Sequence, residues 1–316
     1  MPQRHHRTAR RVMAFLAAAG LTLGAVGYVV ARGTTTGSIG IRSISCPVLP
    51  NTNVWNRPVD TLPARSDSST LMSRMGLGRY LHPDFGSFAG YGIPVNVVSA
   101  LTPRSSVTFT WPSESDAGPY PIPASPRIEG GSDRHILMID MTACRLWELF
   151  AASKGPAGWS AGSGAIYDLR SNALRPDGWT SADAAGLPIY PGLARYDEVA
   201  AGYVGHALRF TVPETRNAHI YPARHDASSL TGSSYPPMGL RLRLKANVDT
   251  SKFGAQTRVI LNTLKRYGMI LADNGSGYYI SGAPDPRWDD DDLHGLHGIT
   301  GAMFEAVDTT GFVNGW

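Results

Sequence analysis

Residues 135–150 read HILMIDMTACRLWELF and hold the clearest secondary-structure pattern in the chain. Side chains alternate with a period of two on both sides of a short central segment, which is the repeat of an extended backbone. In the first half one face is formed by His135, Leu137 and Ile139, and in the second by Leu146, Glu148 and Phe150. The stretch predicts two adjacent strands.

The same alternation recurs outward from this stretch, in residues 107–111, 206–212 and 240–248. Residues 269–272 and 278–281 predict a β-hairpin around a loop at 273–276. Two helices are expected, one from Ser66 or Asp67 to Met75 and one from Ser251 to Tyr267, which Gly268 would end. The stretch from Gly155 to Pro191 predicts a long structured loop. Together these patterns predict a mostly β fold, an antiparallel, jelly-roll-like β-sandwich with one or two peripheral helices.

Composition limits the classes of protein. The chain has 316 residues, of which 42% are hydrophobic and only 17% charged, so it can bury a large core. Four of its 29 Lys and Arg lie in residues 1–31, which contain no Asp or Glu, leaving 25 basic and 25 acidic residues in the rest. A balanced body of this kind argues against a nucleic-acid partner.

The N-terminus predicts export. Four arginines precede twenty uncharged residues, Val12 to Ala31, as in a signal peptide or an N-terminal membrane anchor. We therefore expect a leader at 1–31, a polar linker at 32–45 and a single extracytoplasmic β-rich domain at 46–316. The product would be secreted or anchored to the outer face of the cytoplasmic membrane, with a membrane contact only if the leader is uncleaved. An oxidising compartment would permit Cys46 and Cys144 to form a disulfide, and two buried free thiols are the alternative.

Two carboxylates are the first candidates for chemistry. Glu148 shares its predicted strand face with Leu146 and Phe150, so its pKa should be raised unless a cation pairs with it. A carboxylic acid with a raised pKa can protonate a glycosidic oxygen while a second carboxylate serves as nucleophile or base. Asp168 and Asp183 are the preferred partners, followed by Asp197 and Glu198. Pairing of Glu148 with an arginine is the structural alternative.

A second candidate is the segment from His219 to Asp226, in which His219, Arg224 and His225 would gather on a loop. Such a group could serve a polysaccharide lyase, assist a hydrolase or, together with His206, form a metallohydrolase. Its spacing matches no standard zinc motif, so we predict neither a metal nor a cofactor. A solvent-exposed polar loop is the alternative.

Further residues are candidates for substrate binding. Arg241 and Arg243, followed by Lys245, would form a cationic strand face, either simply solvated or a track for an acidic polymer. Trp179 could stack on a sugar, and Asp183 and Arg224 could bind its polar groups.

Several motifs carry a resemblance to a group of exported bacterial proteins of unassigned activity. They are NRPVD at 56–60, GSGAIYDL at 162–169, GWTSADAAGLP at 178–188, RHDAS at 224–228 and ADNG at 272–275. The resemblance runs from about Trp55 to Phe304. It implies export and a shared fold, and it brings no catalytic assignment.

These features predict a glycan-active enzyme that hydrolyses an extracellular or cell-wall polysaccharide. Glu148 would be the acid, Asp168 the second carboxylate, and His219 and His225 would line the cleft. A lyase or metallohydrolase using the histidine loop is one alternative. A non-catalytic carbohydrate-binding or surface structural module is the other.

Overall fold

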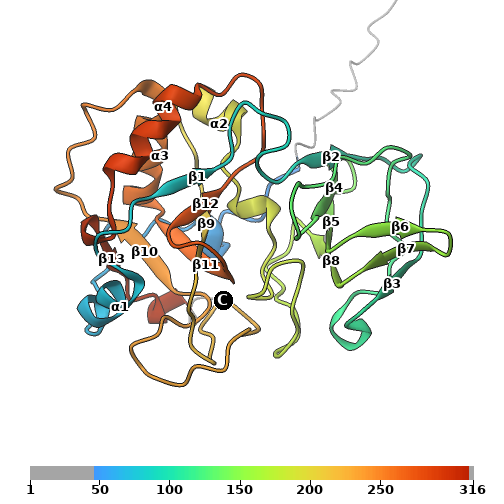
Figure 1. Cartoon of the computed structure of the whole chain (residues 1–316), viewed down its shortest axis with the longest axis horizontal. Coiled ribbons are helices and arrows are strands. Elements are labelled where there is room, and N and C mark those ends of the chain that lie inside the picture. The colour runs from blue at the N-terminus through green and yellow to red at the C-terminus, as the bar shows by residue number, and fades with distance from the viewer. Residues whose placement is uncertain (1–45, 313–316) are drawn as a thin grey trace, which may run out of the picture. The chain divides into compact units, whose positions relative to one another are not determined.

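The computed structural model describes residues 46–312, and within them the strands form three sheets (Figure 1). All of the described residues belong to one compact unit of the chain. The predicted leader and linker lie outside the described residues. No helix within residues 46–312 combines the length and the apolar character needed to cross a membrane.

The large sheet has the strand order β1-β12-β9-β11-β10-β13 and is drawn on the left of Figure 1. Its strands are β1 (His82–Asp84), β9 (Leu208–Val212), β10 (Arg241–Leu244), β11 (Met269–Asn274), β12 (Tyr279–Ser281) and β13 (Phe304–Ala306). β9 and β11 form its buried centre, where Phe210, Leu271 and Ile280 are fully enclosed. Burial of such side chains contributes about 1.5–3 kcal/mol each, so this centre is the main stabilising element of the fold.

The other two sheets lie on the right of Figure 1. The second sheet has the order β2-β4-β5-β8, formed by β2 (Val95–Val97), β4 (Ile136–Asp140), β5 (Arg145–Phe150) and β8 (Ser163–Asp168). The third sheet has the order β3-β7-β6, formed by β3 (Val107–Phe109), β6 (Ser153–Gly155) and β7 (Gly158–Ala161). A separate apolar cluster that includes Ile136, Met138 and Leu149 joins these two sheets.

Four α-helices occur in the described part of the chain: α1 (Ser68–Met75), α2 (Tyr196–Ala200), α3 (Ala255–Arg266) and α4 (Asp290–His294). α1 agrees with the prediction. α3 begins later than expected, and its end is as predicted because Gly268 has φ +65°, a conformation that favours glycine. At α4 the Asp289 side chain accepts a hydrogen bond from the Asp292 N–H and caps the helix.

The chain is rich in strands and poor in helices, as predicted, and contains more strand than helix. The sheets, however, are mixed, so an antiparallel jelly-roll is not confirmed. β1 pairs with β12, β9 with β11, β2 with β4 and β3 with β7 in parallel. Parallel pairs require crossover connections, whereas the sequence pattern shows only where strands lie and not how they pair.

The predicted hairpin at 269–281 is wrong. β11 and β12 do not pair, because β9 lies between them, parallel to β11 and antiparallel to β12. The connection crosses the end of β9, where Gly275 and Tyr278 donate their N–H groups to Val212 and Thr211. The apolar strand β9 is better buried between two neighbours than at an edge, and this outweighs the local turn signal.

The predicted loop from Gly155 to Pro191 is only partly a loop. Its first part holds β7 and β8, and β8 is paired along its length with β5. The small residues of β8 hid the strand because they carry little apolar pattern; Gly164, for example, lies against the Phe109 ring. Irregular chain follows from residue 169 to 189 and forms part of the site described below.

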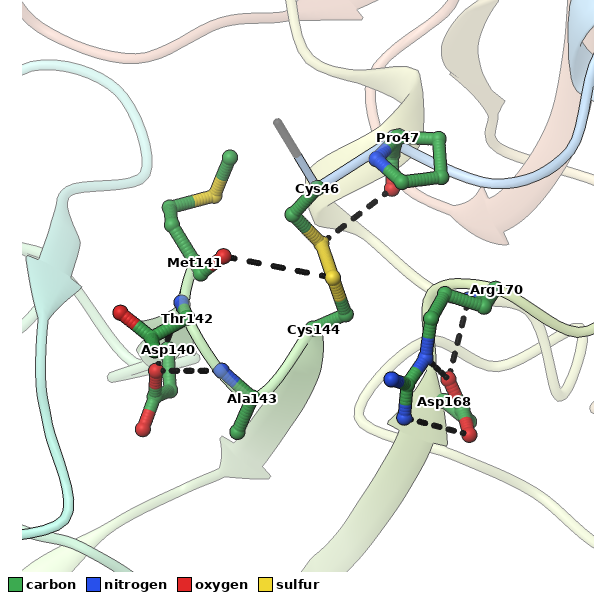
Figure 2. The surroundings of a disulfide bond; sticks show 9 residues. All are labelled: Cys46, Pro47, Asp140, Met141, Thr142, Ala143, Cys144, Asp168 and Arg170. Carbon is green, nitrogen blue, oxygen red and sulfur yellow. Dashed lines mark hydrogen bonds and ion pairs between the residues drawn. A yellow bond between two sulfur atoms is a disulfide. The ribbon is translucent and has the colours of Figure 1, made fainter. Parts of the chain in front are cut away.

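A disulfide joins Cys46 to Cys144 across 98 positions of sequence (Figure 2). Cys144 lies in the turn between β4 and β5, where the Asp140 carboxylate accepts the N–H groups of Thr142 and Ala143. The bond therefore ties the first described residue to the tight turn of the second sheet. This resolves the alternatives left by the sequence in favour of a disulfide.

Replacing Cys144 by Ser should lower the free energy of unfolding by about 2–5 kcal/mol, because the unfolded chain regains the freedom of a loop of roughly a hundred residues. Denaturant titration checks this. Cys46→Ser and the double variant should show the same loss, and reductant should destabilise only the natural sequence. Equal stability of all four proteins with and without reductant would contradict the prediction.

Candidate functional site

A pocket of about 470 Å³ lies where the large sheet meets loops of the second and third sheets. Trp111 and Glu114 come from the segment after β3, Phe150 from the end of β5, and Asp273 and Asn274 from the end of β11. The remaining lining residues are Asp133, Ser163, residues 180–184, His225 and Ala227. Segments far apart in sequence thus contribute polar and aromatic groups to one concavity, which is the usual form of a ligand site.

Arg209 and Asp183 form a buried ion pair beneath this pocket. Arg209 Nε lies 3.0 Å from Asp183 Oδ2, and Nη2 lies 2.7 Å from Oδ1, so the guanidinium holds both carboxylate oxygens. The side chain of Asp183 is 0% exposed and that of Arg209 only 5%. The third nitrogen of Arg209 donates to the Ser281 hydroxyl on β12. The pair holds the loop residue Asp183 against the central strand β9.

Asp273 is the accessible carboxylate of this group. A bulge at Ala272 shifts the pairing of β11 with β9, and the Ala272 carbonyl accepts the Ala185 N–H from the loop. Bulges re-aim side chains next to functional sites. Asp273 remains 22% exposed, and its Oδ2 lies 3.8 Å from Arg209 Nη2.

The pKa of Asp273 is raised to about 8, first because burial disfavours its charge and second because the negative Asp183 lies beside it. The Arg209 charge acts in the opposite direction but is already engaged by Asp183. A carboxylic acid that keeps its proton at neutral pH, next to an ionised carboxylate, is the arrangement of an acid catalyst.

A second buried ion pair supports the loop that carries Asp183. His135 Nδ1 contacts the Glu129 carboxylate, and Nε2 donates to the Ala182 carbonyl at 2.9 Å. Burial alone would lower the pKa of His135, but the hydrogen bond and charge of Glu129 raise it to about 9. The imidazolium therefore anchors the residue immediately before Asp183.

Glu114 and His225 also line this pocket and lie beside each other. The Thr180 N–H donates to Glu114 Oε2 at 3.3 Å, and His225 Nε2 lies 3.8 Å from the same oxygen. His225 Nδ1 donates to the Ala184 carbonyl at 2.8 Å, which orients the ring. Both side chains are about one-third exposed or less, at 31% for Glu114 and 26% for His225. Glu114 is thus a positioned carboxylate that solvent can reach.

Glu148 lies elsewhere. It is fully buried on β5 and is not among the residues that line the pocket. Its pKa is raised to about 7 by burial, as the sequence predicted, although the N–H groups of Ile189 and Tyr190 donate to it and partly oppose the shift. The side chain closes the N-terminus of the short helix Tyr190–Gly192.

Asp168 does not join Glu148 in a shared pocket. It lies at the end of β8, more than a third exposed, and pairs with Arg170 in the surroundings of the disulfide (Figure 2). This ion pair lowers the pKa of Asp168. Glu148 aligns with Ala165 in the pairing of β5 with β8, whereas Asp168 aligns with Arg145 at the far end. The expected carboxylate pair is therefore not assembled.

The histidine loop is divided by the fold. His225 enters the pocket, whereas His219 lies between Asp177 and Asp226, with its two ring nitrogens 3.1 and 3.0 Å from their carboxylate oxygens. Arg224 also pairs with Asp177, at 3.1 Å. Trp179 stands over the Arg175 guanidinium and does not line the pocket. Of the predicted binding residues, the pocket receives Asp183.

The predicted cationic track does not exist on the surface. Arg241 is 1% exposed and donates to the carbonyls of Tyr267, Val54 and Arg57. Arg243 pairs with Glu305 and binds the carbonyls of Val59 and Leu62. Both arginines therefore connect β10 to neighbouring chain segments, because buried carbonyls need donors. Burial lowers the pKa of Arg241 to about 9.

The histidines do not assemble a metal centre. His206 is buried beside Glu198 and Arg195, in a different part of the fold from His225. Among the described residues, no group of three or more His, Cys, Asp or Glu side chains is placed to hold a metal ion.

Sequence reasoning missed Arg209, Asp273 and Glu114. Asp273 lies in the predicted hairpin loop at 273–276, and Arg209 lies within the alternating segment at 206–212, where no motif distinguishes it. The available signal was an acidic residue directly after the apolar run at 269–272. Comparisons of the chain with known protein families, with curated proteins and with solved structures find no match.

Replacing Arg209 by Met should lower the free energy of unfolding by about 3–5 kcal/mol, because it leaves the Asp183 carboxylate buried without its cation. Asp183→Leu added to this variant should recover part of the loss. Arg258→Met, which removes an exposed arginine on α3, is the matched control. Chemical denaturation measures all four proteins, and an Arg209→Met protein as stable as the Arg258→Met control would contradict the assignment.

Glu148→Gln should change how stability depends on pH. The folded-state pKa of Glu148, about 7, exceeds its ordinary value, so the folded protein holds the proton more strongly and loses stability as pH rises from about 4.5 to 7. Relative to the natural protein, the variant should therefore gain about 2–3 kcal/mol across that range. Glu214→Gln, at an exposed site, should give no such slope. A stability difference that stays constant from pH 5 to 8 would disprove the raised pKa.

Proposed function

We propose that this protein is an extracytoplasmic glycan hydrolase in which Asp273 is the general acid and Glu114 the general base. The observation that carries the proposal is Asp273, a partly exposed carboxyl group that lines the pocket and whose pKa is raised beside the Asp183–Arg209 pair. Asp183 is a positioning residue, since it is fully enclosed and acts through Asp273.

The chemistry divides between two carboxyl groups that line the pocket. Asp273 gives its proton to the glycosidic oxygen as the bond to the anomeric carbon breaks. Glu114 removes a proton from a water molecule whose oxygen forms the new bond at that carbon. One water is consumed, and two chain ends with hydroxyl groups are produced. An inverting mechanism of this kind requires the two carboxyl groups to be about 6.5–9.5 Å apart, so that the water fits between them.

Glu114 suits the role of base because it is accessible and oriented. The Thr180 N–H fixes one carboxylate oxygen, and its contact with His225 holds the same oxygen against the loop. A restrained base contributes more than a mobile one, because the reactive geometry is already formed.

Sugars are the preferred substrate class because of the aromatic wall. Trp111 is 46% exposed and lies roughly parallel to Phe150, with an angle of 22° between the ring planes. Flat aromatic faces next to carboxylates match the apolar ring face and hydroxyl edge of a pyranose.

Export is part of the same proposal. The disulfide favours an oxidising compartment. The basic, then uncharged, N-terminal sequence and the resemblance to exported bacterial proteins support the same location, either secreted or membrane-anchored.

Incubating the purified full-length chain with a panel of polysaccharides and measuring new reducing ends tests the activity. Asp273→Asn and Glu114→Gln should each lower kcat by about 100-fold or more. Activity should decline as pH rises past about 8, when Asp273 loses its proton. Glu214→Gln, a surface change, should leave the rate unaltered.

Three outcomes would count against this proposal. If each cleavage produced an unsaturated sugar as well as a new reducing end, the enzyme would be a lyase. Binding without product would indicate a carbohydrate-binding module. Full activity of the Asp273→Asn protein would remove the acid from its role.

A further inference from the structure

The charged side chains that line the pocket are predominantly acidic. Four carboxylates line it, those of Glu114, Asp133, Asp183 and Asp273, while no lysine or arginine of the described residues does. The nearby Arg209 is buried and forms an ion pair with Asp183. Asp183 is neutralised by Arg209, and His135 behind the loop is paired with Glu129, so Glu114 and Asp133 leave a net negative field in the pocket.

The serine hydroxyl groups of the pocket also offer a ligand no free hydrogen-bond donor. The Ser163 hydroxyl donates to the Ser181 carbonyl, and the Ser181 hydroxyl donates to the carbonyls of Asp183 and Leu187. Their donors are therefore already used inside the protein. The carboxylates of Glu114 and Asp133, which only accept hydrogen bonds, are therefore the main groups that the pocket offers to a ligand.

We propose that this pocket selects a glycan with positively charged amino groups, a polymer of free hexosamine, over neutral glycans, and that it rejects uronates. An ammonium group brings three donors to Glu114 and Asp133, whereas a uronate brings only acceptors and a like charge. The exposed face of Trp111 adds packing for the sugar ring and attraction for a nearby cation. The inference rests on the proposed glycan activity for its ligand class and reverses the expectation of an acidic polymer.

Binding by a protein that does not cleave separates this inference from the proposed reaction. Full-length Asp273→Asn protein is titrated with glucosamine, N-acetylglucosamine and galacturonate oligosaccharides of equal length, using calorimetry. The glucosamine oligomer should bind about tenfold tighter than the acetylated one, which corresponds to about 1.4 kcal/mol. The galacturonate oligomer should bind weakest, and raising the salt concentration should narrow the differences.

Asp133→Asn in the same background should reduce the preference for glucosamine several-fold, because it removes one of the two free charges. Asp60→Asn, at an exposed position outside the pocket, is the matched control and should leave it unchanged. Equal or tighter binding of galacturonate, a preference untouched by Asp133→Asn, or no binding of any oligomer would overturn the inference. If the natural protein hydrolysed no glycan but the preference for glucosamine oligomers were still observed, only the proposed reaction would be overturned.

Discussion

The ion pair of Arg209 with Asp183 is the contact on which the rest of the site depends. A carboxylate with no exposed surface would be protonated or expelled if it were alone, so the bidentate guanidinium is the reason that the loop at 180–184 can lie against the large sheet. Arg209 sits on β9, whose neighbours β11 and β12 carry Asp273 and Ser281. Three adjacent strands and one loop therefore meet at a single cation.

The unusual strand order makes that meeting possible. If β11 and β12 formed a hairpin, Arg209 would not lie between them, and Asp273 would occupy a turn in solvent. Because β9 is inserted, the end of β11 lies over the guanidinium, and the bulge at Ala272 turns Asp273 toward the pocket. The topology of the large sheet thus places Asp273 beside Arg209, and it also buries the apolar strands.

Local patterns predicted much of the fold and little of the site. The strands at 136–150, α1, and the end of α3 at Gly268 follow from periodicity and capping, which act within a few residues. Glu148 was correctly expected to be a buried acid with a raised pKa, but its carboxylate binds the backbone of Ile189 and Tyr190. Whether a buried acid faces a pocket or a helix end depends on segments forty residues away. Arg241 was misjudged for the same reason: alternation gives the face of a residue, but not what covers that face.

Glu148 and Asp273 both have raised pKa values, but they differ in whether a ligand can reach them. Glu148 and Asp273 both resist ionisation because they are poorly hydrated. The carboxylate oxygens of Glu148 accept hydrogen bonds from backbone N–H groups, and the side chain has no solvent-exposed area. No substrate can therefore reach its proton. The carboxyl group of Asp273 is partly exposed, and part of the rise in its pKa comes from the charge of Asp183, which Arg209 holds in place. A raised pKa shows that a proton is retained; exposure and a fixed neighbour decide whether it can be transferred.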